Sequence, residues 1–134
     1  VDLAREERME NLATGGLIDL GNAYFTRAEY ENAERYFRQA LEFARKDEGR
    51  RNEARALLSL GSLRVQQNKA AEAREFIGQA MPFYEAGGYR KEVAQANILL
   101  GRAFEMTENF DEALEAYKKV ENSEDDAIRA YVQM

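Results

Sequence analysis

Hydrophobic residues in this chain recur at helical spacing in paired blocks, and each pair of blocks returns forty residues further on. In the first pair, Leu17, Leu20 and Tyr24 share one helical face, and Ala33 and Phe37 share another. Polarity rises between the two blocks of every pair. The pattern predicts three helical hairpins, with helices over residues 14–27 and 30–46, 52–67 and 70–86, and 89–107 and 110–121.

A leucine–glycine pair stands inside the first helix of each hairpin, where glycine is unfavourable by roughly 1 kcal/mol relative to alanine. The pairs are Leu20-Gly21, Leu60-Gly61 and Leu100-Gly101. Antiparallel helices approach to about 8–10 Å, and the closest crossings require small residues. We therefore expect each glycine to face an alanine of the second helix, and these alanines are Ala33, Ala73 and Ala113.

Other glycines set expectations for the ends of helices. Gly49 and the pair Gly87-Gly88 follow predicted helices. A left-handed residue commonly follows a helix, and glycine adopts that conformation without steric cost. We therefore expect Gly49 and one glycine of the later pair to end the second and fourth helices.

The spaced residues resemble the signature of the tetratricopeptide repeat, W-x2-L-G-x2-Y followed by A-x3-F and a proline. The first segment carries this signature, apart from its tryptophan and proline, at Leu17, Leu20, Gly21, Tyr24, Ala33 and Phe37. Arg64 and Asn97 replace aromatic or apolar signature residues in the later segments. The period of forty looks like a subfamily with extended helices, since the usual period is about 34. HEAT and armadillo repeats share a period of about 40 but lack the leucine–glycine signature.

The resemblance implies an all-α fold, a right-handed α-α superhelical solenoid of three tetratricopeptide-like hairpins with partial flanking helices. We expect one domain over residues 1–134. Its parts are a tail helix of a preceding repeat at 1–13, repeat 1 at 14–48, repeat 2 at 52–88, repeat 3 at 89–122, and the start of a further or capping helix at 123–134. This interpretation makes the chain a piece of a longer solenoid.

Composition restricts the chemistry that the chain can perform. The 134 residues, 45% of them hydrophobic and 33% charged, suffice for one domain with its own core. Cysteine and histidine are absent, which removes disulfides, thiolate chemistry and the commonest general base and metal ligand. The sequence contains no glycine-rich phosphate loop, metal-ligand spacing or nucleophile beside a base. We expect no enzyme activity, no catalytic or metal-binding residue and no cofactor.

Charge and hydropathy restrict the partners. A formal charge of −6 opposes binding to nucleic acid phosphates. No apolar run reaches the roughly 18–20 residues of a membrane-spanning helix, and the first residues are charged rather than signal-like. We therefore expect a soluble, cytoplasmic module that binds neither nucleic acid nor membrane.

One basic cluster leaves two interpretations open. Its members are Arg45, Lys46, Arg50, Arg51 and Arg55. The cluster is able to hold an acidic partner. Acidic residues at positions 47, 48 and 53 interrupt it, however, so a solvated surface is the favoured interpretation.

In proteins that this sequence resembles, the first helices of successive hairpins line a concave groove that holds a peptide or a helix. The resemblance implies groove residues at fixed offsets from each glycine. They are Ile18, Asp19, Asn22, Phe25 and Thr26; Leu58, Ser59, Ser62, Val65 and Gln66; and Ile98, Leu99, Arg102, Glu105 and Met106. Ile18, Leu58 and Ile98 would form an apolar stripe suited to an amphipathic helix. The alternative is that these apolar residues pack against a neighbouring helix.

The resemblance implies a protein–protein interaction module that binds a peptide or amphipathic helix in the groove, within a larger protein. The carboxylate clamp of co-chaperone repeats is not expected, because Ile18, Ser59 or Ser62, Gln95 and Leu99 occupy its lysine, asparagine and arginine positions. One alternative function is self-assembly into homo-oligomers through apolar solenoid ends. A second alternative is a ligand-sensing regulatory domain for an attached kinase or transcription factor.

Overall fold

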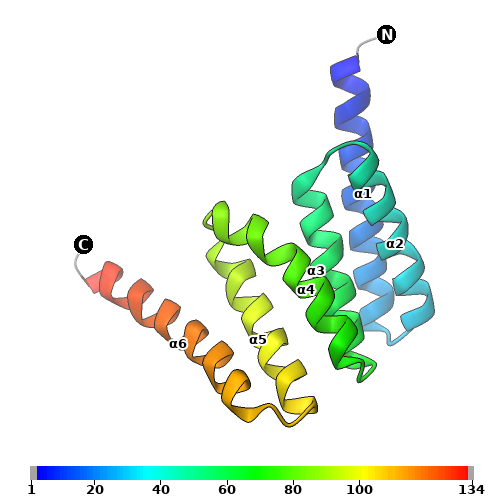
Figure 1. Cartoon of the computed structure of the whole chain (residues 1–134). Helices are drawn as coiled ribbons and strands as arrows, with labels where there is room; N and C mark the ends of the chain where they lie inside the picture. Colours follow the sequence, from blue (N-terminus) through cyan, green and yellow to red (C-terminus); the bar gives the residue numbers. More distant parts are fainter. Residues whose placement is uncertain (1–2, 133–134) are drawn as a thin grey trace.

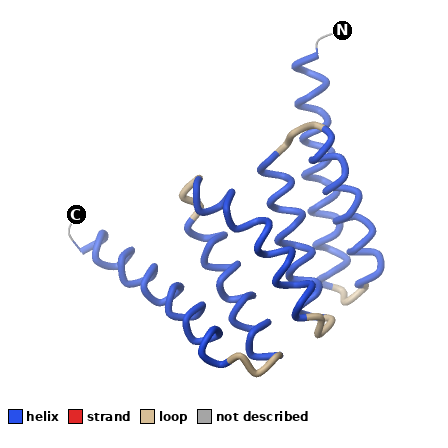
Figure 2. The backbone as a smooth tube through the Cα atoms, in the orientation of Figure 1, coloured by secondary structure: helices blue, strands red, loops and turns tan. Residues whose placement is uncertain are grey.

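A computed structural model describes the backbone of residues 3–132 and the side chains of residues 12–122. Over this range the chain is helical, without a strand, and short loops join the helices (Figure 2). The helices are α1 (Leu3–Thr26), α2 (Tyr30–Lys46), α3 (Arg50–Gln66), α4 (Ala70–Ala86), α5 (Arg90–Met106) and α6 (Phe110–Val132). The expected all-α fold is confirmed.

The helices pack in the order of the sequence, as Figure 1 shows. Within the hairpins, α1 packs on α2, α3 on α4 and α5 on α6. Between hairpins, α2 packs on α3 and α4 on α5, and the first helices also touch, α1 with α3 and α3 with α5. This arrangement is an α solenoid of three helical hairpins.

The helices follow a regular register that fixes their ends. The helices α2 to α5 have 17 residues each. The middle residue of each connector has a positive φ angle, and these residues are Ala28, Glu48, Asn68, Gly88 and Glu108. The next residue donates its backbone N–H to a carbonyl of the preceding helix, for example Gly49 to Ala44 at 2.8 Å and Tyr89 to Tyr84 at 3.0 Å. The helices α1 to α5 therefore each end in a Schellman-type turn.

The expectation for the helix-ending glycines was right at Gly88 and wrong at Gly49. Gly88 has φ 69°, but the residue that ends α2 is Glu48, with φ 56°. Gly49 has φ −79° and caps the start of α3. The hydrogen bond of the turn sets which residue becomes left-handed, and a side chain there costs only about 1–2 kcal/mol.

The two ends of the solenoid differ from the expected boundaries. The predicted tail helix at 1–13 is not separate, because α1 runs unbroken from Leu3 to Thr26. The predicted new helix at 123–134 does not begin there, because α6 runs unbroken from Phe110 to Val132. Within residues 3–132, left-handed residues occur only in the five connectors, and no proline interrupts either of these helices. Residues 1–2 and 133–134 lie outside the described part.

The leucine–glycine pairs mark the crossings inside the hairpins. A Cβ atom on Gly21 would lie 2.6 Å from Cε1 of Phe37, and one on Gly61 would lie 2.6 Å from Cγ1 of Ile77. Gly101 meets the ring of Tyr117 in the same way. The close approach is confirmed, but the space is filled by these larger side chains rather than by the alanines. The alanines approach the added Cβ with their carbonyl oxygens in the first two crossings, at 3.3 Å and 3.5 Å.

Candidate protein-binding groove

The first helices of the three hairpins surround a pocket of about 440 Å³, which we call the α1–α3–α5 pocket. In Figure 1 these helices lie in sequence across the solenoid. The lining residues are Ile18, Asn22, Phe25 and Thr26 of α1; Arg51, Arg55, Leu58, Ser59 and Ser62 of α3; Tyr84 in the last turn of α4; Tyr89 of the α4–α5 connector; and Glu92 and Gln95 of α5. The α3 members are spaced so that one helical face carries them all.

Several of the residues implied by the resemblance line this pocket. They are Ile18, Asn22, Phe25, Thr26, Leu58, Ser59 and Ser62. Phe25 is half-buried, but two apolar members lie beneath the surface, since Ile18 is 1% exposed and Leu58 is 5% exposed. Both belong to the hydrophobic core. The pocket therefore has a covered apolar floor and polar walls.

The expected apolar stripe is not an exposed surface. Ile98 is 43% exposed but does not line the pocket, unlike Ile18 and Leu58. Val65 and Leu99 are also buried. The alternative interpretation, packing against a neighbouring helix, holds for the buried members.

The remaining predicted residues lie outside the pocket, where most of them link neighbouring helices. An Asp19 carboxylate oxygen accepts a hydrogen bond from Arg55 Nη2 at 3.2 Å, joining α1 to α3. Arg102 Nη2 donates to Gln66 Oε1 at 3.3 Å, joining α3 to α5. Glu105 accepts a hydrogen bond from the Tyr117 hydroxyl. Met106 is partly exposed at the end of α5.

The fixed offsets missed six lining residues. They lie closer to the helix ends than the offsets reach, and they are Arg51, Arg55, Tyr84, Tyr89, Glu92 and Gln95. A signal was present, because Arg51 and Arg55 share a helical face with Leu58, which the offsets did find. Tyr84 and Tyr89 give no such signal, because an aromatic residue near a helix end is equally compatible with a place in the hydrophobic core.

The missed tyrosines give the pocket an aromatic wall. The rings of Tyr84 and Tyr89 meet edge to face with centroids 5.7 Å apart, and Tyr89 stacks on Phe83 at 5.5 Å. The guanidinium carbon of Arg51 lies 5.7 Å from the centroid of Tyr89. Burial raises the pKa of Tyr84 to about 12, Glu92 adds to the rise, and Arg55 and Arg51 oppose it. The Tyr84 hydroxyl therefore stays protonated at neutral pH and can donate a hydrogen bond.

Comparison with known families decides what kind of solenoid this is. A tetratricopeptide repeat model matches residues 13–86, more than half of the chain, and a second matches residues 94–126. The chain belongs to the tetratricopeptide repeat family. Among curated proteins, none matches the sequence. The long-period subfamily stays a prediction.

Tetratricopeptide repeats are generally protein–protein interaction modules, and the family is typically non-catalytic. Among the described residues no group of three or more acidic, histidine or cysteine side chains is arranged to hold a metal ion. In the same part of the chain no helix is both long and apolar enough to cross a membrane. The described groups thus offer polar and aromatic surface for binding.

One departure from the tetratricopeptide signature creates a buried charge cluster. Arg64, at the position of the signature tyrosine, is 5% exposed. Its two Nη atoms donate to the two carboxylate oxygens of Glu34 on α2, each at 2.8 Å, and its Nε lies 2.6 Å from Glu72 Oε2 on α4. The hydrogen bonds from Arg64 are the main cause that lowers the pKa of Glu34 to about 2. The cluster joins the first two hairpins.

Proposed function

We propose that this module binds an extended segment of a protein partner in the α1–α3–α5 pocket. The proposal rests on one observation, that the first helices of all three hairpins contribute polar side chains to a single pocket. Its volume of about 440 Å³ falls within the range of roughly 300–1,000 Å³ that is usual for ligand pockets.

The chemistry of the walls favours an extended peptide over the apolar face of a helix. Asn22, Ser59, Ser62 and Gln95 offer hydroxyl and amide groups that can both donate and accept hydrogen bonds. An extended peptide presents unpaired backbone N–H and C=O groups, whereas a helix has satisfied its own. Since the apolar floor is covered, a docked helix would find little apolar surface there.

Filling the pocket tests the proposal. Peptides selected from a random display library on the unmodified chain are expected to bind at least about tenfold more weakly to Ser59→Trp, because the indole occupies the space of the peptide. Ala71→Trp is the matched control, since Ala71 is exposed on α4 and does not line the pocket. Dissociation constants are measured by fluorescence anisotropy, with thermal unfolding to check that both variants fold.

Two results would contradict pocket binding. One is a library that yields no peptide binding the unmodified chain. The other is a set of selected peptides whose affinity for Ser59→Trp and Ala71→Trp is equal to that for the unmodified chain.

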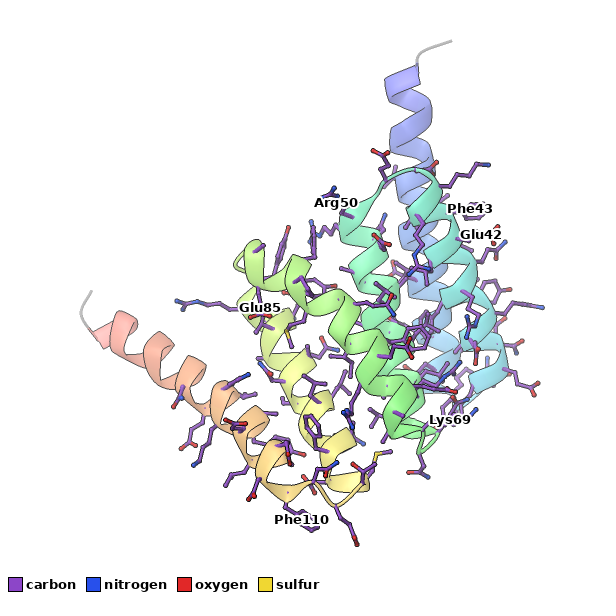
Figure 3. All side chains as sticks on the ribbon, in the orientation of Figure 1. Glu42, Phe43, Arg50, Lys69, Glu85 and Phe110 are labelled. Carbon is purple, nitrogen blue, oxygen red and sulfur yellow. The ribbon has the colours of Figure 1, made fainter. Side chains whose placement is uncertain are left out.

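We propose self-assembly as a second candidate, because the outer faces of the first and third hairpins carry exposed apolar residues. Leu20 is 41% exposed, whereas Leu60 at the same position of the second hairpin is fully buried. At the other face Phe110 and Leu114 are exposed, and Figure 3 marks Phe110 at the α5–α6 turn. Contiguous exposed apolar surface favours association.

The junctions inside the solenoid suggest how two copies would meet. Glu34 of the first hairpin contacts Arg64 of the second, and Arg74 of the second lies 4.7 Å from the ring of Phe104 of the third. Leu114 holds the position of Glu34 and Arg74 in the third hairpin. Head-to-tail docking would place Leu114 against Tyr24 of another copy, an apolar pair.

A mixing experiment tests head-to-tail docking. The mass of the unmodified chain is expected to rise with concentration in light scattering. Leu20→Glu and Leu114→Glu each block one face, so each variant alone should stay monomeric, while their mixture should form a dimer through the two intact faces. A constant monomer mass for the unmodified chain, or a monomeric mixture, would rule the arrangement out.

A further inference from the structure

The basic cluster near the start of α3 divides between different surfaces of the fold. Arg45 is held by Glu53 Oε2 at 3.0 Å and by Gln79 Oε1 at 3.2 Å. Arg50, marked in Figure 3, lines a separate pocket between α3 and α4. Only Arg51 and Arg55 line the α1–α3–α5 pocket. The five cations lie close together in the sequence, but in the structure only two of them line the same pocket.

Of the two cations in this pocket, Arg51 is the one whose N–H groups remain available to a ligand. Arg55 already donates to Asp19 at 3.2 Å and to Asn52 at 3.4 Å. Within the described residues, Arg51 makes no ion pair, and its guanidinium rests on the face of the Tyr89 ring. A guanidinium resting on an aromatic face keeps its N–H edges available for an acceptor.

The Tyr84 hydroxyl is a second donor without an acceptor. Tyr84 is only 2% exposed and lines the pocket. Its ring meets the Tyr89 ring edge to face, and Arg51 rests on the face of Tyr89, so Tyr84 and Arg51 lie at the same end of the pocket. No described residue accepts a hydrogen bond from it. The hydroxyl oxygen is not among the fully enclosed polar atoms that lack a partner, so it reaches the solvent of the pocket and can donate to a bound acceptor there.

We propose that this end of the α1–α3–α5 pocket is a subsite for an acidic side chain of the bound peptide, held by Arg51 and the Tyr84 hydroxyl. The inference rests on the proposed function. A carboxylate accepts two or more hydrogen bonds, and charge-assisted bonds to guanidinium are the stronger class. Arg55 adds positive charge, whereas Asp19 partly neutralises it.

Glu92 limits what else the subsite can accept. It lines the same pocket from α5, and no ion pair holds it among the described residues. Its charge opposes a second acidic group on the α5 side and suits a backbone N–H or a basic side chain there. The preferred segment therefore carries an acidic residue beside neutral or basic residues, rather than an acidic run.

The test compares peptides selected from a random display library on three forms of the chain. The unmodified chain and Arg50→Gln are expected to select peptides enriched in aspartate or glutamate. Arg51→Gln is expected to lose that enrichment and to bind the peptides selected on the unmodified chain about tenfold more weakly. Arg50→Gln is the matched control, because it removes the adjacent charge from a different pocket. Tyr84→Phe, which removes only the hydroxyl, should weaken the same peptides severalfold, and Glu92→Gln should strengthen them.

The outcomes separate this inference from the proposed function. Peptides that bind and respond to Ser59→Trp, but show no acidic enrichment, overturn the subsite while leaving pocket binding intact. Equal losses for Arg50→Gln and Arg51→Gln would also overturn it, since the effect would then be one of net charge. Failure to select any pocket-binding peptide would contradict both the acidic subsite and peptide binding in the pocket.

Discussion

Replacing Gly61 with leucine is expected to lower the free energy of unfolding by about 3 kcal/mol. The first added atom already meets Ile77 Cγ1 at 2.6 Å, and the carbonyl oxygen of Ala73 lies 3.5 Å away. The rest of the leucine side chain has no space without separating α3 from α4, because Ile77 is fully buried. Urea denaturation followed by circular dichroism measures the change.

Gly16→Ala is the matched control for this crossing. Gly16 lies in α1, and a Cβ atom there would meet nothing within 4 Å. Alanine should stabilise that helix by roughly 0.5–1 kcal/mol, whereas Gly61→Ala should destabilise the protein. Combining Gly61→Ala with Ile77→Ala should cost less than the sum of the two single changes, because alanine at position 77 lacks the Cγ1 atom that the added Cβ meets at 2.6 Å. If both glycine-to-alanine changes stabilise the protein equally, the crossing argument is wrong.

Replacing Arg64 with methionine is expected to cost about 2–3 kcal/mol of stability. Methionine keeps much of the volume but removes the partner of Glu34 and Glu72. Removing one partner from a fully buried pair costs about 3–5 kcal/mol, and the two carboxylates here can regain some hydration. Arg38→Met is the control, because Arg38 also pairs with Glu34 at 2.7 Å but is exposed. Exposed pairs contribute about 0–1 kcal/mol, so this change should be small.

The dependence of stability on pH checks the same cluster. Glu34 has a pKa of about 2 in the folded chain, against an ordinary glutamate value of 4.5. Its pairing therefore stabilises the fold fully above the unfolded pKa, and the contribution is lost as pH falls from 4.5 towards 2. The difference in unfolding free energy between the unmodified chain and Arg64→Met should shrink over that interval. A difference that stays constant with pH would place the effect of Arg64 in packing rather than charge.

The hairpins were predictable because their signal is repeated and local. Leu20, Leu60 and Leu100 recur beside glycines at a fixed spacing, and such periodicity specifies helices and their partners. The connectors were harder, since Glu48 and Ala28 adopt a conformation that their residue types disfavour. The hydrogen bond that closes the turn, rather than local preference, decides those positions.

The pocket was predictable only in part, because its walls depend on how neighbouring hairpins stack. The offsets found Asn22 and Ser62, which face the pocket from the middle of their helices. They did not find Tyr84, which reaches the pocket from a second helix. They also gave Ile18 as surface, although the packing of α1 against α3 covers it. The sequence shows which face of a helix a residue occupies, but tertiary packing decides whether a neighbouring helix covers that face.

The constant spacing of the helix starts determines which deletions and duplications in the gene preserve the fold. Helices α2 to α6 begin at residues 30, 50, 70, 90 and 110, so equivalent hairpins lie forty residues apart. Deleting or duplicating forty consecutive codons within this region rejoins each helix in phase, wherever the breakpoint falls. Unequal recombination can therefore lengthen or shorten the protein without respecting a boundary between units, and the number of units can vary faster than the fold.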